Sequence, residues 1–237
     1  MWKILGIGFI IILIIGNKGG YHMINKNAFR SMSYGVYIIS TLDGGRPTGC
    51  VANSAIQITS EPATIAVSIN HDNYTNGCIE KTGKFAISIL SEESDPGLIG
   101  TFGFQSGKDI DKFDGVEVVV REDVSIVADA CGYVVCNVID KMETSTHTVF
   151  LGQVIDADVL KEKAAMTYAY YHKVVKGKSP KNAPTYIAEE AEEVKAEKWI
   201  CGICGYEYDG AVPFEELPGD FTCPLCKQPK SVFKKVD

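Results

Sequence analysis

The chain has 237 residues, of which 46% are hydrophobic and 22% are charged. These proportions are ordinary for a globular protein, and they exclude a chain that is disordered throughout and a collagen-like fibre. The net charge of −7 argues against nucleic acid as the main partner, because binding to a phosphate backbone needs a basic face. The length allows one large domain, or one medium-sized domain and a small one.

The N-terminal segment contains an apolar run, residues 4–15, which is too short for a membrane span of about 20 residues. No small-x-small cleavage site of a signal peptide follows it. Lys18-Gly19-Gly20 can be encoded by a bacterial ribosome-binding sequence, and two residues separate it from Met23. We therefore expect residues 1–22 to be a translated leader or apolar N-terminal segment, with translation starting at Met23. A membrane anchor and a signal peptide are the alternatives, and we expect no stable membrane association.

Strand patterns dominate the next part of the chain, with a helix expected over residues 25–32 and another over residues 75–81. Asp43-Gly44-Gly45 is a typical hairpin turn. Runs rich in β-branched and aromatic residues predict strands over 35–41, 50–59, 64–70, 84–90, 116–120, 125–127, 133–139 and 148–157. Many short strands with few helices indicate a mainly β fold, a β-barrel with accessory helices.

The composition changes near residue 177. The following stretch contains Pro180, Pro184 and a run of acidic residues from Glu189 to Glu193, which is typical of an exposed linker. We therefore expect a first domain over residues 23–176, a linker over residues 177–198 and a small domain over residues 199–237.

Two C-x-x-C pairs lie in the small domain, at Cys201/Cys204 and Cys223/Cys226. Four thiolates in this arrangement favour a tetrahedral site for a soft metal in a reducing compartment. A domain of about 40 residues has little core of its own, so the metal must contribute to its stability. The 18 residues between the pairs also fit a zinc ribbon.

The residues around these pairs, 199–210 and 213–226, resemble rubredoxin, and Phe233 continues the resemblance. The resemblance implies one iron held by the four cysteines, passing one electron at a time, with an aromatic cap that keeps water from the sulfurs. Zinc is the alternative metal. Two departures stand out: the stretch between the pairs is shorter than in most free-standing rubredoxins, and Lys227 occupies a position where glycine often follows the second pair.

Motifs in the larger domain resemble the flavin reductase family. They follow one another in the order 48–54, 59–62, 65–70, 85–91, 111–113 and 147–154. The resemblance implies an FMN-binding split β-barrel, with NAD(P)H as substrate and FAD as the open alternative to FMN. The expected fold is therefore an FMN-binding split β-barrel plus a small rubredoxin-like iron-binding domain.

Candidate flavin ligands lie on a run of small residues and on a strand end followed by a helix start. Small residues let backbone N–H groups approach a flavin ring, and a helix start suits a phosphate, although Asn73 or Thr75 could simply cap the helix. The expected cofactor-binding residues are Gly49, Cys50, Val51, Ala52, Asn53, Ser54, Asn70, Asn73, Thr75, Ser106 and Lys112.

His147 is the expected catalytic residue, because the resemblance implies a histidine near the flavin and the nicotinamide; a structural histidine is the alternative. The cysteines outside the pairs share no ligand spacing, so we expect small buried hydrophobic residues at Cys50, Cys78, Cys131 and Cys136.

A flavin next to a one-electron iron makes chemical sense, because a hydride carries two electrons and a flavin can release them singly. The combination resembles high-molecular-weight rubredoxins and the reductases that supply flavodiiron proteins. It implies a cytoplasmic homodimer that passes electrons from NAD(P)H through FMN to the iron and on to a partner protein such as a flavodiiron protein. The alternatives are a flavin reductase that supplies reduced FMN to a separate monooxygenase and a non-enzymatic protein that binds FMN and zinc.

Overall fold

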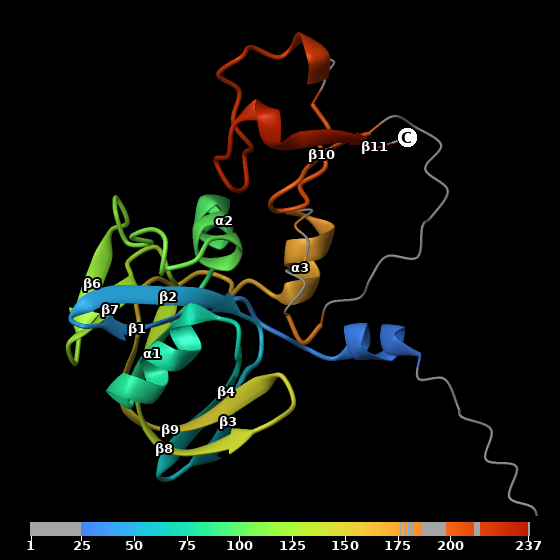
Figure 1. Ribbon diagram of the computed structural model, residues 1–237. Helices are drawn as coiled ribbons and strands as arrows, with labels where there is room; N and C mark the ends of the chain where they lie inside the picture. Colours follow the sequence, from blue (N-terminus) through green and yellow to red (C-terminus); the bar gives the residue numbers. More distant parts are fainter. Residues whose placement is uncertain are drawn as a thin grey trace, which may run out of the picture.

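The computed structural model describes residues 25–175, 198–210 and 214–236, together with residues 177, 179 and 183–185 (Figure 1). The expected leader over residues 1–22 and most of the expected linker lie outside these residues. We call residues 25–175 the barrel unit and residues 198–210 and 214–236 the cysteine unit. Within the described residues, no helix is both long enough and apolar enough to cross a membrane.

The barrel unit is built on one antiparallel sheet of seven strands in the order β2-β1-β5-β8-β9-β4-β3. The strands are β1 (Tyr37–Asp43), β2 (Arg46–Ala52), β3 (Ala55–Ser60), β4 (Ala63–Asn70), β5 (Lys84–Ile89), β8 (Gly132–Glu143) and β9 (His147–Val159). Strands β2 and β3 are opposite edges of this sheet, yet only Asn53 and Ser54 connect them in the chain. The sheet must therefore curl into a barrel.

The break between β2 and β3 corrects the single strand expected over residues 50–59. The first half of this stretch pairs with β1 and the second half with β4, so the backbone has to turn from one edge to the other at Asn53-Ser54. The Ser54 carbonyl accepts a hydrogen bond from the Ser68 N–H at 2.9 Å, which holds the turn against β4. Apolar residues that suit a strand lie on both sides of Asn53-Ser54, which is why the sequence pattern does not reveal the break.

The hairpin expected at residues 43–45 is confirmed. Asp43 pairs with Arg46, and Gly44 and Gly45 take φ values of 57° and 95°, in the left-handed region that favours glycine. A second small sheet, β6 (Val118–Arg121) and β7 (Val124–Val127), packs on the barrel. The Ser40 hydroxyl of β1 donates to the Ser125 carbonyl of β7 at 2.5 Å.

Four short helical segments accompany the strands in the described part of the barrel unit. Helix α1 (Tyr74–Thr82) and the 3₁₀ turn η1 (Lys26–Ser31) lie where helices were expected. Helix α2 (Pro96–Phe104) and helix α3 (Tyr168–Lys173) were not predicted by the sequence pattern. The Asp95 carboxylate accepts from the Gly97 N–H at 2.9 Å and Pro96 begins the helix, so α2 has a good N-terminal cap in spite of its three glycines.

The cysteine unit contains a two-stranded sheet, β10 (Lys198–Cys201) and β11 (Phe233–Val236), with short 3₁₀ turns η2 (Phe214–Glu216) and η3 (Lys230–Val232). Figure 1 shows this unit at the ends of α2 and α3. Its buried side chains and those around α2, α3 and β1 form one continuous hydrophobic cluster. The two units are therefore packed against each other.

Lys112 is a buried lysine that ties α2 to the barrel. Its side chain is 3% exposed, and its ammonium donates to the Gly49 carbonyl of β2 at 2.9 Å and to the Phe102 carbonyl of α2 at 3.0 Å. Burial lowers the pKa of Lys112 from its ordinary value of 10.5. The ammonium therefore satisfies two carbonyls at the cost of its own hydration.

We expect Lys112→Met to lower the free energy of unfolding by about 1–3 kcal/mol at neutral pH, because it leaves two buried carbonyls without a donor. The wild-type protein should gain stability as pH rises from the lowered pKa towards 10.5, because over that window the unfolded state binds more protons than the folded state. The Met variant should lack this slope. Denaturant unfolding as a function of pH measures both effects.

The matched control is Lys108→Met, which changes an exposed lysine on the same loop and should alter neither the stability nor its pH dependence. An unchanged stability of Lys112→Met would contradict the structural role of this ammonium.

Candidate functional site

Four buried cysteines form a compact cluster in the cysteine unit. The Sγ atoms of Cys201, Cys204, Cys223 and Cys226 all lie within 4.8 Å of one another. The Cys201–Cys226 and Cys204–Cys223 sulfur pairs are 3.6 Å apart. Metal–sulfur bonds of about 2.3 Å in a tetrahedron place the sulfurs about 3.8 Å apart. The cluster therefore fits a single tetrahedral metal ion, as the spacing of the two pairs predicts.

The two C-x-x-C pairs have the same backbone geometry. The Gly205 N–H donates to the Cys201 carbonyl at 2.9 Å, and the Lys227 N–H donates to the Cys223 carbonyl at 2.8 Å. Gly205 and Lys227 take φ values of 75° and 57°. Lys227 thus adopts the left-handed conformation of its glycine counterpart, although a side chain there is strained.

The close approach of the four sulfurs shifts the pKa values of the thiols. Hydrogen bonding with Cys204 and Cys226 lowers the pKa of Cys223, while hydrogen bonding with Cys223 and Cys226 raises the pKa of Cys204. A metal ion at this position would bind the thiolate forms.

The expected aromatic cap is present. Trp199 stacks on Phe214 with ring centroids 4.5 Å apart, and Phe214 lies 4.8 Å from Phe233. Tyr208 and Phe221 complete the cluster through edge-to-face contacts. Phe214 and Phe233 are buried in the same hydrophobic cluster as the four cysteines, so these rings keep water from the small core around the sulfurs.

A cavity of about 100 Å³ lies in the barrel unit, between β2, β4, α2 and α3. Its lining is Val36, Cys50, Val51, Ala52, Asn53, Ser68, Ile69, Asn70, Asn73, Ile99, Gly103, Phe104, His147, Tyr168, Tyr171, Ser179, Ala183 and Pro184. Strand β2 is an edge of the sheet, so its outer backbone N–H and C=O groups have no strand partner. Small side chains, apolar walls and backbone donors together fit a flavin ring.

The cavity is smaller than the ~300–1,000 Å³ typical of cofactor sites. Ser179, Ala183 and Pro184 narrow it, and Thr185 next to them accepts a hydrogen bond from the Asn53 amide at 2.8 Å. Holding a whole flavin nucleotide therefore requires these residues to move, or the phosphate end of the nucleotide to lie outside the cavity.

Seven of the predicted flavin-site residues meet at this cavity. They are Cys50, Val51, Ala52, Asn53, Asn70, Asn73 and His147. His147 begins β9 and pairs with Asn70 of β4, which brings two distant parts of the sequence together. Its Nδ1 lies 2.8 Å from the Thr146 hydroxyl. The catalytic role of His147 stays a prediction.

The other predicted residues lie outside the cavity lining. The Lys112 ammonium donates a hydrogen bond to the Gly49 carbonyl, and the Ser54 hydroxyl donates to the Asn53 side chain at 2.9 Å. Thr75 is in the first turn of α1, where its N–H donates to the Asn73 side chain at 3.2 Å. Asn73 therefore caps the helix. The Ser106 hydroxyl accepts from the Lys108 N–H at 3.2 Å. The expected contacts of Gly49 and Ser54 with the flavin ring stay predictions, as do those of Thr75, Ser106 and Lys112 with its phosphate.

Sequence reasoning missed the walls of the cavity formed by α2 and α3. Ile99, Gly103 and Phe104 come from α2, and Tyr168 and Tyr171 from α3. Glycines at every third position of α2 were the available signal, because such spacing brings them towards one side of a helix. The expectation for the remaining cysteines is confirmed: Cys50, Cys78, Cys131 and Cys136 are all buried and free, and burial raises their pKa values.

Tyr171 links the cavity and the cysteine cluster. It lines the cavity and is 4% exposed, in the same hydrophobic cluster as Cys204 and Cys226. Burial raises its pKa most, and the nearby charges of Cys204, Tyr168 and Cys226 raise it further. The candidate flavin site and the candidate metal site are therefore neighbours.

The fold and the two sites agree with the comparisons. The flavin reductase-like domain family matches residues 29–179. The chain therefore belongs to the flavin reductase-like family, and it is an oxidoreductase. The solved structure of flavin reductase PheA2 in its native state has a TM-score of 0.52 and 27% identity to this chain, covering 58% of this chain and 86% of that one.

Two relatives match this chain over different lengths, one over nearly the whole chain and one over about two thirds of it. The chain is 40% identical over 228 residues to the high molecular weight rubredoxin of Moorella thermoacetica, covering 90% of this chain and 100% of that protein. It is 39% identical over 162 residues to the ferric-chelate reductase (NAD(P)H) of Archaeoglobus fulgidus, covering 68% of this chain and 96% of that protein. The chain thus combines a flavin reductase-like domain with a rubredoxin-like one, which implies flavin and iron as cofactors and NAD(P)H as reductant.

We expect Lys227→Gly to raise the thermal stability of the iron site by about 0.5–1 kcal/mol, because it removes the left-handed strain of a lysine and adds only the backbone entropy of glycine. The measurement is the temperature at which the full-length protein loses its iron–thiolate absorbance. Gly205→Ala is the opposite change at the equivalent position and should lower that temperature. A lower temperature for Lys227→Gly would contradict the strain argument.

Proposed function

We propose that the protein passes electrons from NAD(P)H through FMN to the four-cysteine iron site and on to a partner protein. The observation that carries this proposal is that one helix, α2, separates the flavin cavity from the cysteine cluster. Ile99 and Gly103 of α2 line the cavity, while Cys226 contacts the same helix at Gly100. In this proposal the flavin domain spans residues 23–176, the linker residues 177–198 and the iron domain residues 199–237.

The residues divide the chemistry between the two sites. A bound flavin supplies the step that takes two electrons as hydride and releases them one at a time. In this proposal the backbone of Cys50–Asn53 orients the ring, and His147, which lines the same cavity, contacts the nicotinamide. The four cysteines hold a site that takes one electron at a time, so each hydride requires two transfers past α2 and two onward transfers to the partner.

The proposed partner is a flavodiiron protein, and the proposed location is the cytoplasm, where free thiols persist. We also propose a homodimer with each flavin near the subunit interface. Exposed apolar side chains on the outer face of the sheet support this: Ile56 of β3 is 65% exposed and Met142 of β8 is 59% exposed. Sedimentation of the flavin-loaded protein as a monomer would contradict the dimer.

Anaerobic addition of NADH or NADPH to the purified protein tests the electron pathway. We expect both the flavin and the iron–thiolate absorbance to be bleached. Cys223→Ser should remove the iron band and leave flavin binding and flavin reduction intact, because the cavity contains no residue of the cysteine unit. Bleaching of the flavin alone in the wild-type protein would contradict transfer to the iron.

A flavin reductase that supplies reduced FMN to a separate monooxygenase is the second candidate. The similarity to flavin reductase PheA2 favours it, since 86% of that chain is matched by only 58% of this one. Gel filtration after reduction separates the two candidates: retained flavin supports the electron-transfer proposal, and released flavin supports the reductase alternative.

A further inference from the structure

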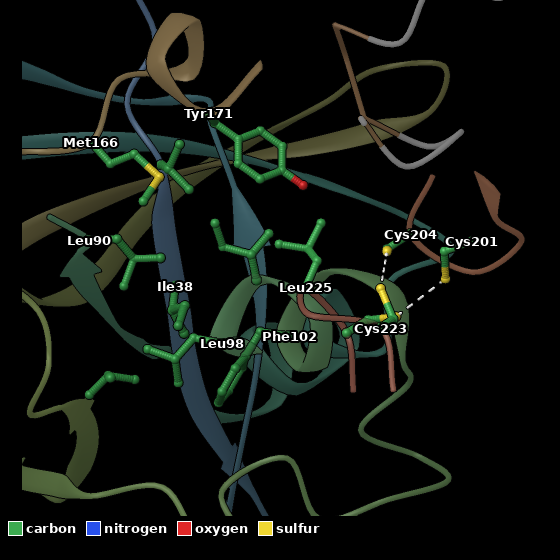
Figure 2. Close-up of a cluster of buried hydrophobic side chains, with 14 of the residues drawn as sticks. Ile38, Leu90, Leu98, Phe102, Met166, Tyr171, Cys201, Cys204, Cys223 and Leu225 are labelled. Carbon is green, nitrogen blue, oxygen red and sulfur yellow. Dashed lines mark hydrogen bonds between the residues drawn. The ribbon is translucent and has the colours of Figure 1, made fainter. Parts of the chain in front are cut away.

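The two cysteine pairs differ in what covers them. Ile203 and Leu225 occupy the same position in Cys201-Gly202-Ile203-Cys204 and Cys223-Pro224-Leu225-Cys226. Ile203 is 43% exposed, whereas Leu225 is 2% exposed. Figure 2 shows Leu225 pointing towards Tyr171 of the barrel unit. All four cysteines are buried, so the difference between the pairs lies in the intervening residue: Leu225 is covered by the barrel unit, whereas Ile203 is left exposed.

Gly100 makes the contact between the two units possible. A Cβ atom at this position would lie 2.4 Å from the Cα atom of Cys226 and 2.5 Å from the carbonyl oxygen of Leu225. Both are backbone atoms, so no side-chain rotation could relieve the clash. One turn earlier, a Cβ at Gly97 would lie 3.2 Å from the Cε atom of Lys227. The backbone of the second pair thus lies directly on a glycine face of α2.

The flavin cavity lies on a neighbouring face of the same helix. Ile99 and Gly103 line the cavity, and Ile99 is adjacent to Gly100. Tyr171 of α3 also lines the cavity and belongs to the same buried cluster as Leu225 and all four cysteines, so it is the Gly100 contact that singles out the second pair. Of the two pairs, the second is the one whose backbone reaches the helix that forms the cavity wall.

We propose that Gly97, Gly100 and Tyr171 form a docking surface for the second cysteine pair, and that Cys226 is the metal ligand through which electrons enter the iron site. The inference rests on the proposed electron-transfer function and names the contact that serves it. Each docking event moves one electron from the flavin, reduced beforehand by NAD(P)H, to ferric iron, which becomes ferrous. No bond to carbon, oxygen or sulfur forms or breaks.

The first test compares Leu225→Ala with Ile203→Ala in the full-length protein loaded with flavin and iron. Leu225→Ala should weaken docking, raise hydrogen exchange in α2 and increase the radius of gyration in small-angle scattering. It should slow flavin-to-iron transfer in a single turnover by at least about tenfold, which corresponds to ~1.4 kcal/mol of docking free energy. Ile203→Ala should leave all three measurements unchanged, because Ile203 faces solvent.

The second test replaces a glycine in α2, and a control glycine in α1, by alanine, so the sequence of the cysteine unit stays unchanged. Gly100→Ala should produce the same three changes, because the added methyl group meets backbone atoms of Cys226 and Leu225. Gly77→Ala is the matched control in α1, where a Cβ meets nothing within 4 Å. Both variants should retain the iron and flavin spectra, so a loss of docking is distinguishable from a failure to fold.

Hydrogen exchange separates this inference from the proposed function. If α2 is protected in the wild-type protein and exposed in Gly100→Ala, but the iron is never reduced, the docking surface stands and the electron-entry role of Cys226 is overturned. If α2 exchanges alike in the wild-type protein, Gly100→Ala and Leu225→Ala, the docking surface itself is overturned, whatever the rate of iron reduction.

Discussion

Helix α2 packs against the barrel and the cysteine unit at the same time, and the arrangement of the cavity and the cysteine cluster depends on this double contact. Ile99 and Gly103 form a wall of the candidate flavin cavity, while Gly100 contacts the backbone of Cys226. A helix can serve both only if its side chains are small where the cysteine unit approaches. The three glycines of α2 therefore let the cysteine unit and the cavity approach the helix backbone closely from different sides.

The rest of the barrel unit holds this helix in place. The Lys112 ammonium joins the Phe102 carbonyl of α2 to the Gly49 carbonyl of β2, so the helix and the edge strand that face the cavity are fixed to each other. The chain then leaves β2 through Asn53 and Ser54 to close the barrel on the far edge. The cavity thus lies beside the point where the chain passes from the edge strand β2 to the edge strand β3. The outer backbone groups of an edge strand are available there for a ligand.

Features fixed by local chemistry were predictable from the sequence. The four metal ligands follow from the C-x-x-C spacing, and the Gly44-Gly45 turn follows from the need for positive φ angles. Helix α2 was not predictable, because each of its glycines disfavours a helix by about 1 kcal/mol and its nearly all-apolar sequence shows no periodicity. The Asp95 cap and Pro96 start the helix, and the packing of α2 between the barrel and the cysteine unit offsets the unfavourable glycines. The role of Lys112 was hidden for the same reason, since its carbonyl partners come from β2 and α2.

Docking of the two units within one chain makes electron transfer intramolecular, so its kinetics differ from those of a collision between independent domains. In the proposed arrangement, a linker of about 20 residues keeps the iron site at a roughly millimolar effective concentration near the flavin. The Gly100 contact adds a defined geometry to that proximity. The most direct measurement is stopped-flow reduction of the full-length protein by NAD(P)H at several protein concentrations, with the iron–thiolate band followed in time. The account predicts a first-order rate of iron reduction that does not change with protein concentration. A rate that rises in proportion to concentration would contradict it.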